Sequence, residues 1–170
     1  KNRQTAGWGK TELDELFAPC RDVKTETYRF EGDPTEIVIY YAEGLTDKDR
    51  IVEVVLPELE RICSGGGLRE RIHHSLNFGT LPLTRIPADA PSEEISGWIF
   101  EGELLLLFGE LQLFRLSVDK RPHRQPEESN TEVSIKGPKD CFIEDITMNM
   151  ALIRKRIRSH SLAYETFTIG

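Results

Sequence analysis

Apolar runs with the length of buried strands occur twice in the first two thirds of the chain. Residues 37–41 read Ile-Val-Ile-Tyr-Tyr, a β-branched and aromatic run typical of a central strand covered on both faces. Residues 104–108 form the second run, and residues 111–116 follow it after a Gly-Glu pair, which predicts a hairpin with a two-residue type II′ turn. Residues 25–30 alternate instead, which indicates a half-buried strand.

Stretches with helical spacing separate these strands. Three short helices are predicted at residues 11–17, at residues 68–75, and from residue 91 to an end near Gly97 or Gly102, the first capped by Thr11. A longer apolar pattern runs from residue 47 to residue 64, and Pro57 inside it should kink or divide the helix. Strands that alternate with helices in this way predict an α/β fold, which we expect to be built on a mixed sheet.

The most regular helical pattern lies between residues 137 and 158. Gly-Pro opens it, Asp140 is a plausible N-cap, and basic residues follow in the closing turns, as the helix dipole favours. Apolar residues recur at three- and four-residue steps, so we expect one buried stripe made of Phe142, Ile146, Met150, Ile153 and Ile157.

A repeated order of predicted elements suggests how the chain is divided into subdomains. Residues 13–32 give a helix, a polar gap, an alternating strand and a glycine, and residues 150–170 give the same series. We therefore expect a first α/β subdomain over residues 1–118 and a linker with a short strand over 119–136. Residues 137–170 would then hold a junction helix and the first strand of a second, truncated subdomain.

Composition narrows the functional classes. The 170 residues carry a net charge of -7 at pH 7, which argues against a general nucleic-acid binder. The three cysteines are scattered along the sequence and lack metal-ligand spacing, which indicates free thiols in a reducing compartment. Since no apolar run approaches the ~18 residues of a spanning helix, we expect a soluble segment with any membrane spans outside it.

The final third of the chain resembles a known family. Residues 132–138 read Glu-Val-Ser-Ile-Lys-Gly-Pro, and with residues 142–145, Asn149 and residues 152–157 they resemble the signature of the bacterial spore germinant receptor A-subunit family. The turn at residues 41–48 and the Pro- and Glu-bearing linker at 121–128 are similar as well. Cys141 and Met148 depart from the pattern, where a small and a polar residue are commoner.

This resemblance implies a large soluble N-terminal domain, made of two similar α/β subdomains, ahead of a membrane-spanning portion. The implied role is the sensing or transduction of small-nutrient germinants, without catalysis and without a cofactor. The implied partners are a polytopic B subunit, a lipoprotein C subunit and a nutrient. The domain is expected on the cytoplasmic side of the spore inner membrane.

Five residues of the 137–158 helix are candidates for contacts with another domain or subunit. Glu144 and Asp145 are adjacent, about 100° apart on a helix, so they cannot form a facing catalytic pair and either complement the helix dipole or contact an arginine. Arg154 and Arg156 belong to the family pattern. Their basic cluster is expected either to bind acidic lipid headgroups or another subunit's carboxylates, or to be a solvated helix end. Asn149 has poor helix propensity, which indicates a hydrogen bond across the subdomain junction.

The turn formed by Gly44, Thr46 and Asp47 follows a central strand, where open α/β sheets bind ligands. It is a candidate small-molecule site, with helix capping by Thr46 or Asp47 as the other interpretation. No residue is assigned as catalytic, cofactor-binding or metal-ligating, because no nucleophile with a positioned base is visible. The alternative to a germinant receptor domain is a soluble α/β small-molecule-binding protein or a small hydrolase.

Overall fold

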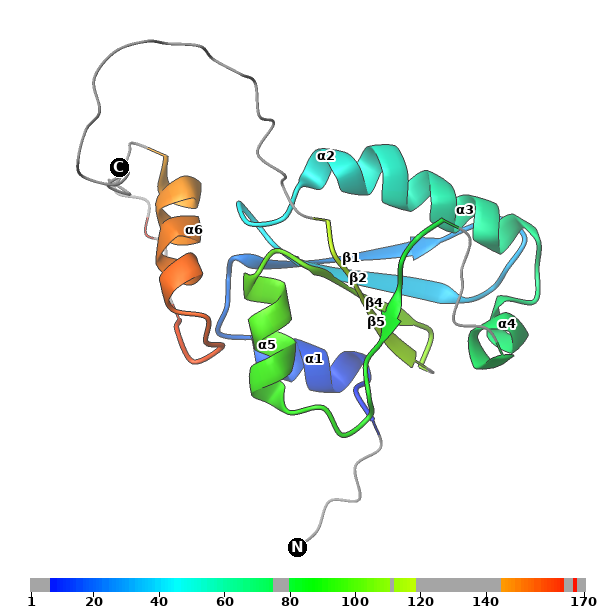
Figure 1. The fold of residues 1–170 in the computed structure, drawn as a ribbon, viewed down its shortest axis with the longest axis horizontal. Helices are drawn as coiled ribbons and strands as arrows, with labels where there is room; N and C mark the ends of the chain where they lie inside the picture. The colour runs from blue at the N-terminus through cyan, green and yellow to red at the C-terminus, as the bar shows by residue number, and fades with distance from the viewer. Residues whose placement is uncertain (1–6, 75–79, 111, 119–144, 164–166, 168–170) are drawn as a thin grey trace, which may run out of the picture.

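A five-stranded antiparallel sheet lies between two layers of helices in the computed structural model of this chain (Figure 1). The structure describes residues 7–74, 80–110, 112–118, 145–163 and 167. The strands are β1 (Val23–Arg29), β2 (Glu36–Ala42), β3 (Thr84–Arg85), β4 (Leu104–Phe108) and β5 (Gln112–Leu116), in the order β1-β2-β4-β5-β3. The α/β class is therefore confirmed, but every pairing among these strands is antiparallel, whereas a mixed sheet was expected.

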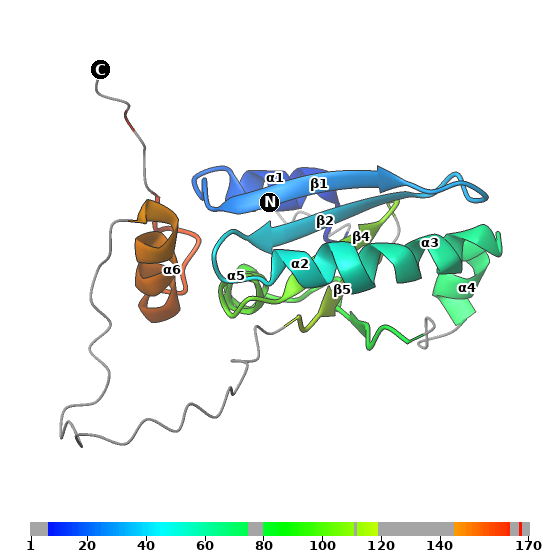
Figure 2. The ribbon, with the colours of Figure 1, turned by 90° about the horizontal axis from the view of Figure 1, so that it is seen from above.

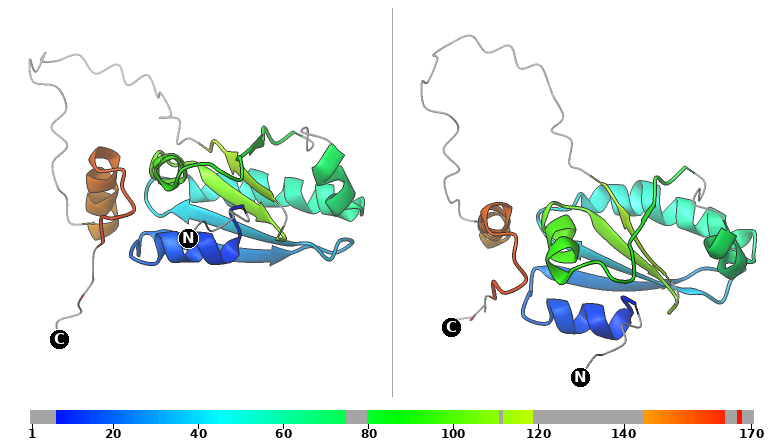
Figure 3. Two further views of the ribbon diagram at one scale, coloured as in Figure 1. Left: turned by 90° about the horizontal axis from the view of Figure 1, so that it is seen from below. Right: turned by 60° about the horizontal axis from the view of Figure 1, so that its bottom comes forward.

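Helices cover both faces of the sheet (Figure 3). The helical segments are α1 (Lys10–Phe17), α2 (Lys48–Arg50), the π-helix η1 (Ile51–Val55), α3 (Leu56–Ser64), α4 (Leu68–His74), α5 (Ser92–Phe100) and α6 (Ile146–Arg156). None of these helices combines the length and the apolar character that crossing a membrane would require, among the residues that the structure describes.

The side chains of β2 alternate between two hydrophobic cores, as strand geometry requires. Ile37 and Ile39 point into the core shared with η1, α3 and α4, while Val38 and Tyr40 point into the core shared with α1 and α5. β4 lies beside β2 and is buried along its whole length. The expectation of two strands covered on both faces is thus confirmed.

Pro57 divides the long helical pattern, as expected. It occupies the first turn of α3, directly after η1, in which the N–H of Leu56 bonds to the carbonyl of Ile51. Because proline has no N–H to donate, the wider π turn ahead of it lets the chain continue without a broken α-helical ladder. The helix therefore changes type at this point and keeps Ile51 and Val55 buried.

Two local predictions were wrong in detail. Phe108 pairs with Gln112, which leaves three residues between β4 and β5 instead of a two-residue turn. α1 is capped by Gly9, whose N–H bonds to the Glu12 carboxylate, and not by Thr11. The strand expected at 131–135 and the linker around it lie outside the described residues, as does most of the strand expected at 162–169.

Candidate functional site at the junction of the C-terminal helix

α6 lies beside the end of the sheet from which the β2–α2 turn leaves (Figures 1 and 2). The helix begins after Asp145, whose carboxylate accepts hydrogen bonds from the N–H groups of Thr147 and Met148. Asp145, and not Asp140, is therefore the N-cap of the helix that the structure describes. Gly44 in the β2–α2 turn has a φ of +83°, and a Cβ placed on it would lie 3.2 Å from the Ala151 Cβ. This backbone turn and α6 are in direct contact.

The face that α6 buries is not the expected apolar stripe. Ile146 is 62% exposed and Ile157 is 50% exposed, Met150 and Ile153 of the expected stripe are half-buried, and the buried residues are Ala151 and Arg154. The prediction failed because the contact with the turn at Gly44 admits only small side chains, and because a charged residue on the same face has a buried partner. Phe142 lies outside the described residues.

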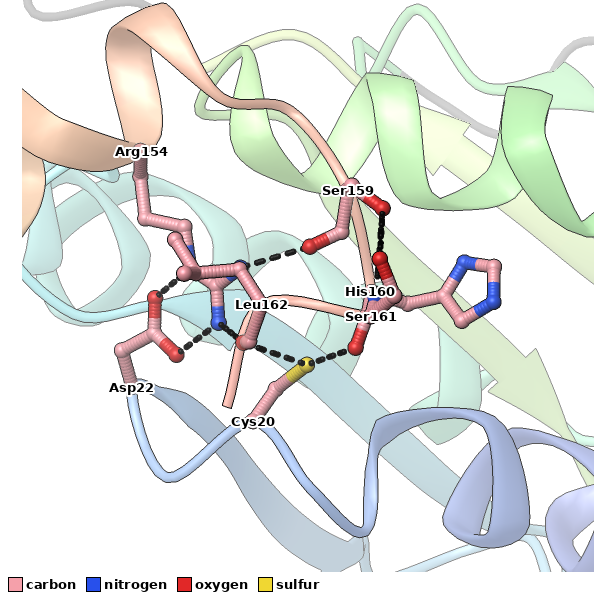
Figure 4. Close-up of polar contacts among 7 residues, drawn as sticks. All are labelled: Cys20, Asp22, Arg154, Ser159, His160, Ser161 and Leu162. Atoms are coloured by element: carbon pink, nitrogen blue, oxygen red, sulfur yellow. Dashed lines mark hydrogen bonds and ion pairs between the residues drawn. The ribbon is translucent and has the colours of Figure 1, made fainter. Parts of the chain in front are cut away.

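Arg154 forms the centre of the junction (Figure 4). Its side chain is 0% exposed, and Nε and Nη2 donate to the two carboxylate oxygens of Asp22 at 2.5 and 2.8 Å. Asp22 precedes β1 and is itself buried. Such a bidentate pair is strong and strongly directional, because two parallel N–H groups match two carboxylate oxygens.

The remaining donors of Arg154 hold the segment that follows α6. Nη1 donates to the carbonyl of Ser159 at 2.6 Å, and Nη2 donates also to the carbonyl of Leu162 at 2.7 Å. The guanidinium carbon lies 4.2 Å from the centroid of the Phe100 ring at the end of α5. One side chain thus connects α6, the segment after it, the start of β1 and α5.

These contacts keep the guanidinium charged. Burial on its own lowers the pKa of Arg154, but the hydrogen bonds and the negative charge of Asp22 outweigh it and raise the pKa above the usual arginine value. A permanently charged group in a dry site requires its counter-ion, because an unpaired buried charge is very costly.

A cysteine extends the same network. Cys20 Sγ donates to the carbonyl of His160 at 3.2 Å, and the Nδ1 of His160 lies 3.1 Å from the Oγ of Ser96 in α5 (Figure 4 shows the thiol beside the arginine). Burial raises the pKa of Cys20, although the neighbouring Arg154 lowers it in part. The thiol is therefore a neutral hydrogen-bond donor in this arrangement.

Charged groups and a small cavity surround the junction. Arg158 Nη1 pairs with Glu101 Oε1, which joins the end of α6 to the end of α5. A cavity of about 270 Å³ lies between α6 and the adjoining ends of β1 and β2. It is lined by Arg21, Asp22, Lys24, Glu43, Ile146, Thr147 and Met150. Among the described residues, no group of three or more His, Cys, Asp or Glu side chains is placed to hold a metal ion.

The other candidate residues lie around this junction. Asn149 is half-buried on α6, Arg156 is exposed at its end, and Glu144 lies outside the described residues. In the β2–α2 turn, Asp47 accepts hydrogen bonds from the N–H groups of Asp49 and Arg50 as the N-cap of α2. Thr46 is buried, and its hydroxyl finds no hydrogen-bond partner among the described residues.

Sequence reasoning named Arg154 but not the residues that it meets. Asp22, Cys20 and Ser96 are single polar residues in a loop or a helix, with no motif or spacing that sets them apart. The only available signal was indirect: an arginine on the face of an amphipathic helix that also carries small residues needs a buried acid somewhere in the fold.

Comparisons with known proteins agree with this fold. Residues 11–170 match the family model described as Bacillus/Clostridium GerA spore germination protein. The chain is 31% identical to spore germination protein XA of Bacillus anthracis over 171 residues, covering 99% of this chain and 35% of that protein. It is 28% identical to stage V sporulation protein AF of Bacillus subtilis (strain 168), covering 79% of this chain and 27% of that protein.

A solved structure shares the fold. The crystal structure of the N-terminal domain of the A subunit of the Bacillus megaterium spore germinant receptor GerK3 superposes with a TM-score of 0.66 at 19% identity. The match covers 99% of this chain and 63% of that one, and the chain spans about a third of the length of the curated relatives. The family resemblance of the sequence is confirmed: the chain belongs to the GerA spore germination protein family.

Proposed function

We propose that this chain is the N-terminal part of a germinant receptor A subunit and acts, without catalysis, in nutrient sensing or signal transduction and in receptor assembly. The match of residues 11–170 to the GerA family carries the proposal. The names of the relatives, which denote spore germination and sporulation proteins, support it. The full-length protein would then span the spore inner membrane with this part on the cytoplasmic side, together with a B membrane subunit and a C lipoprotein.

The junction at Arg154 suggests how such a part would transmit a signal. Three regions distant in sequence meet at one guanidinium: the residue before β1, the end of α5, and α6 with the segment after it. A displacement of α6 away from Asp22 therefore cannot occur without breaking charge-assisted hydrogen bonds. Packed contacts held by such a hydrogen-bond network favour two discrete arrangements over gradual deformation. In this proposal Asp145, Asn149 and Arg156, with Glu144, provide contacts for the partner domain or subunit.

The cavity beside α6 supports a role in nutrient binding. Its volume of about 270 Å³ lies just under the usual range for ligand pockets, roughly 300–1,000 Å³, and suits a molecule of a few heavy atoms. Charges of both signs line it, with Arg21 and Lys24 near Asp22 and Glu43. The turn at Gly44 adjoins it through Thr147.

A gene deletion tests the proposal. Spores without the full-length protein should lose the fall in optical density and the release of dipicolinic acid in response to at least one nutrient among amino acids, sugars and nucleosides. Their response to a non-nutrient trigger such as a cationic surfactant should be unchanged. Wild-type germination with every nutrient would contradict the proposal. Nutrient binding itself is tested separately, by NMR titration of the 170-residue chain with the same compounds.

A further inference from the structure

β1 is an edge strand of the sheet. Among the described residues it pairs with β2 alone, and Figure 2 shows it as the outermost strand of the sheet. Its seven residues, Val-Lys-Thr-Glu-Thr-Tyr-Arg, include neither proline nor glycine, and Thr25, Thr27 and Arg29 are exposed. A long regular edge of this kind is a template for another strand unless something blocks it.

The hydrogen bonds of β1 and β2 show which backbone groups are open. The N–H of Glu43 donates to the carbonyl of Asp22 at 2.8 Å, so the backbone of Asp22 faces β2. Residues alternate along an antiparallel strand, so Thr25, Thr27 and Arg29 face away from β2. At the far end Glu36, opposite Arg29, accepts from the N–H of Gly109 on its other side, which agrees with this assignment.

A second strand of the same sequence fits this edge in a register that the charges select. An antiparallel pairing centred on Thr25 places Lys24 of each copy opposite Glu26 of the other, which gives two pairs of opposite charge on one face. A pairing centred on Glu26 would put two carboxylates against each other, and one centred on Thr27 would put Lys24 opposite Phe30. In the register centred on Thr25, Arg29 lies opposite Arg21 of the other copy. Because Arg29 is already paired with Glu36, the repulsion between these two arginines is limited.

The carboxylate of Glu26 is held ready for such a contact. The hydroxyls of Tyr28 and Tyr41 donate to its two oxygens, and Lys48 Nζ lies 3.8 Å away. The hydrogen bond from Tyr28, with those from Tyr41 and Lys48, holds the pKa of Glu26 below its usual value although burial opposes it. A negative charge is therefore fixed on the face of the edge strand at neutral pH.

We propose that two copies of this chain associate through their β1 strands, paired antiparallel about a two-fold axis at Thr25, so that the two sheets become one. The occupant of the edge is a second copy because the strand is complementary to itself in charge in this register. Lys24 also pairs with Glu43 at 3.4 Å and lines the cavity beside α6, so the contact adjoins the junction at Arg154 at one end of β1.

Sedimentation equilibrium of the 170-residue chain tests the proposal. The wild type should show a monomer–dimer equilibrium. Thr25→Pro should abolish the dimer, because it removes an N–H that points outward and leaves the ladder to β2 intact. Lys24→Glu should raise the dissociation constant by about tenfold or more, since both charge pairs become repulsive. Lys24→Glu with Glu26→Lys should restore dimerisation.

Lys155→Glu is the matched control, because it makes the same charge change at an exposed site on α6. Circular dichroism establishes which variants are folded, and Lys24→Glu decides the matter if Thr25→Pro unfolds the chain. A wild-type chain that stays monomeric up to about 1 mM would overturn the proposal, since weak specific complexes are populated at that concentration. A dimer that Lys24→Glu leaves as tight as Lys155→Glu would overturn it too.

Discussion

The guanidinium of Arg154 and the carboxylate of Asp22 form a buried bidentate ion pair between residues 132 positions apart. Asp22 stands directly before β1, and Arg154 stands in the last turns of α6. Because α6 buries Ala151 and Arg154 and leaves Ile146 exposed, its position depends on this pair more than on apolar packing.

Arg154→Met should release α6 from the sheet. The substitution keeps an apolar stem of similar length but leaves Asp22 without a counter-ion, and removing one partner of a buried pair costs about 3–5 kcal/mol. Amide hydrogen exchange should show the loss of protection in α6, and urea denaturation should show how much of the loss is global. Lys155→Met is the control: it lies on the exposed side of the same helix and should stay within about 0.5 kcal/mol of wild type.

A double variant distinguishes an ion pair from simple packing. Asp22→Asn with Arg154→Met removes both charges, so it should be more stable than the sum of the two single losses predicts, by about 1–3 kcal/mol. Losses that add without interaction would show that the two residues do not act as a pair.

The reactivity of Cys20 should also report the release of α6 from the sheet in Arg154→Met. The thiol is 2% exposed, donates to the carbonyl of His160, and has a pKa raised by burial, so alkylation at neutral pH should be slow. Arg154→Met should accelerate it, since Arg154 holds Leu162 and Ser159 above the thiol. Mass spectrometry of iodoacetamide-treated protein would measure each cysteine. Cys63, buried in the other core, is the internal control and should remain slow.

Local patterns accounted for the sheet, and long-range pairing did not follow from them. The runs at β2 and β4 predicted burial on both faces because a strand between two helical layers has no polar side. The antiparallel pairing of β4 with β5 was predicted as a hairpin, but that of β2 with β4 was not, because helices between strands usually signal parallel neighbours.

The junction was harder to predict because its specificity lies in one pair of charges. A hydrophobic stripe reports which face a helix would bury against an apolar surface. It fails for α6, where Gly44 brings a backbone turn up to Ala151 and the remaining space is filled by Arg154. The N-cap was expected at Asp140 and is Asp145, although an acidic residue at the start of the helix does complement its dipole as expected.

Gly44 and Gly97 should respond to alanine with opposite signs. Gly44→Ala requires a left-handed backbone at φ +83° and brings the new methyl against Ala151 and Thr147, so it should destabilise by about 1–3 kcal/mol. Gly97 lies inside α5 with nothing within 4 Å of its missing Cβ, so Gly97→Ala should stabilise by up to about 1 kcal/mol. Urea denaturation of the pair gives both values. Equal effects would mean that Gly44 is neither held at a positive φ nor packed against α6 in solution.

Asp33 should give the fold part of its acid sensitivity. Its carboxylate accepts the N–H groups of Thr35 and Leu68 at 2.9 and 2.8 Å. Burial alone raises the pKa of Asp33, but these hydrogen bonds outweigh it, so the pKa lies below the usual value. The folded state therefore binds this proton less readily than the unfolded chain does. The stabilisation is complete above the ordinary Asp pKa and is lost as the pH falls through the lowered one.

Asp33→Asn isolates this contribution from those of other carboxylates. At pH 7 the variant should be less stable by about 1–2 kcal/mol, because the charge-assisted bonds to Thr35 and Leu68 weaken. The difference from wild type should shrink as the pH is lowered from about 5 towards 2, where the wild-type carboxyl becomes protonated as well. Asp89→Asn changes an exposed carboxylate and should show no such convergence. Stability curves for Asp33→Asn and wild type that stay parallel down to acid pH would show that Asp33 is not what joins the β1–β2 turn to α4.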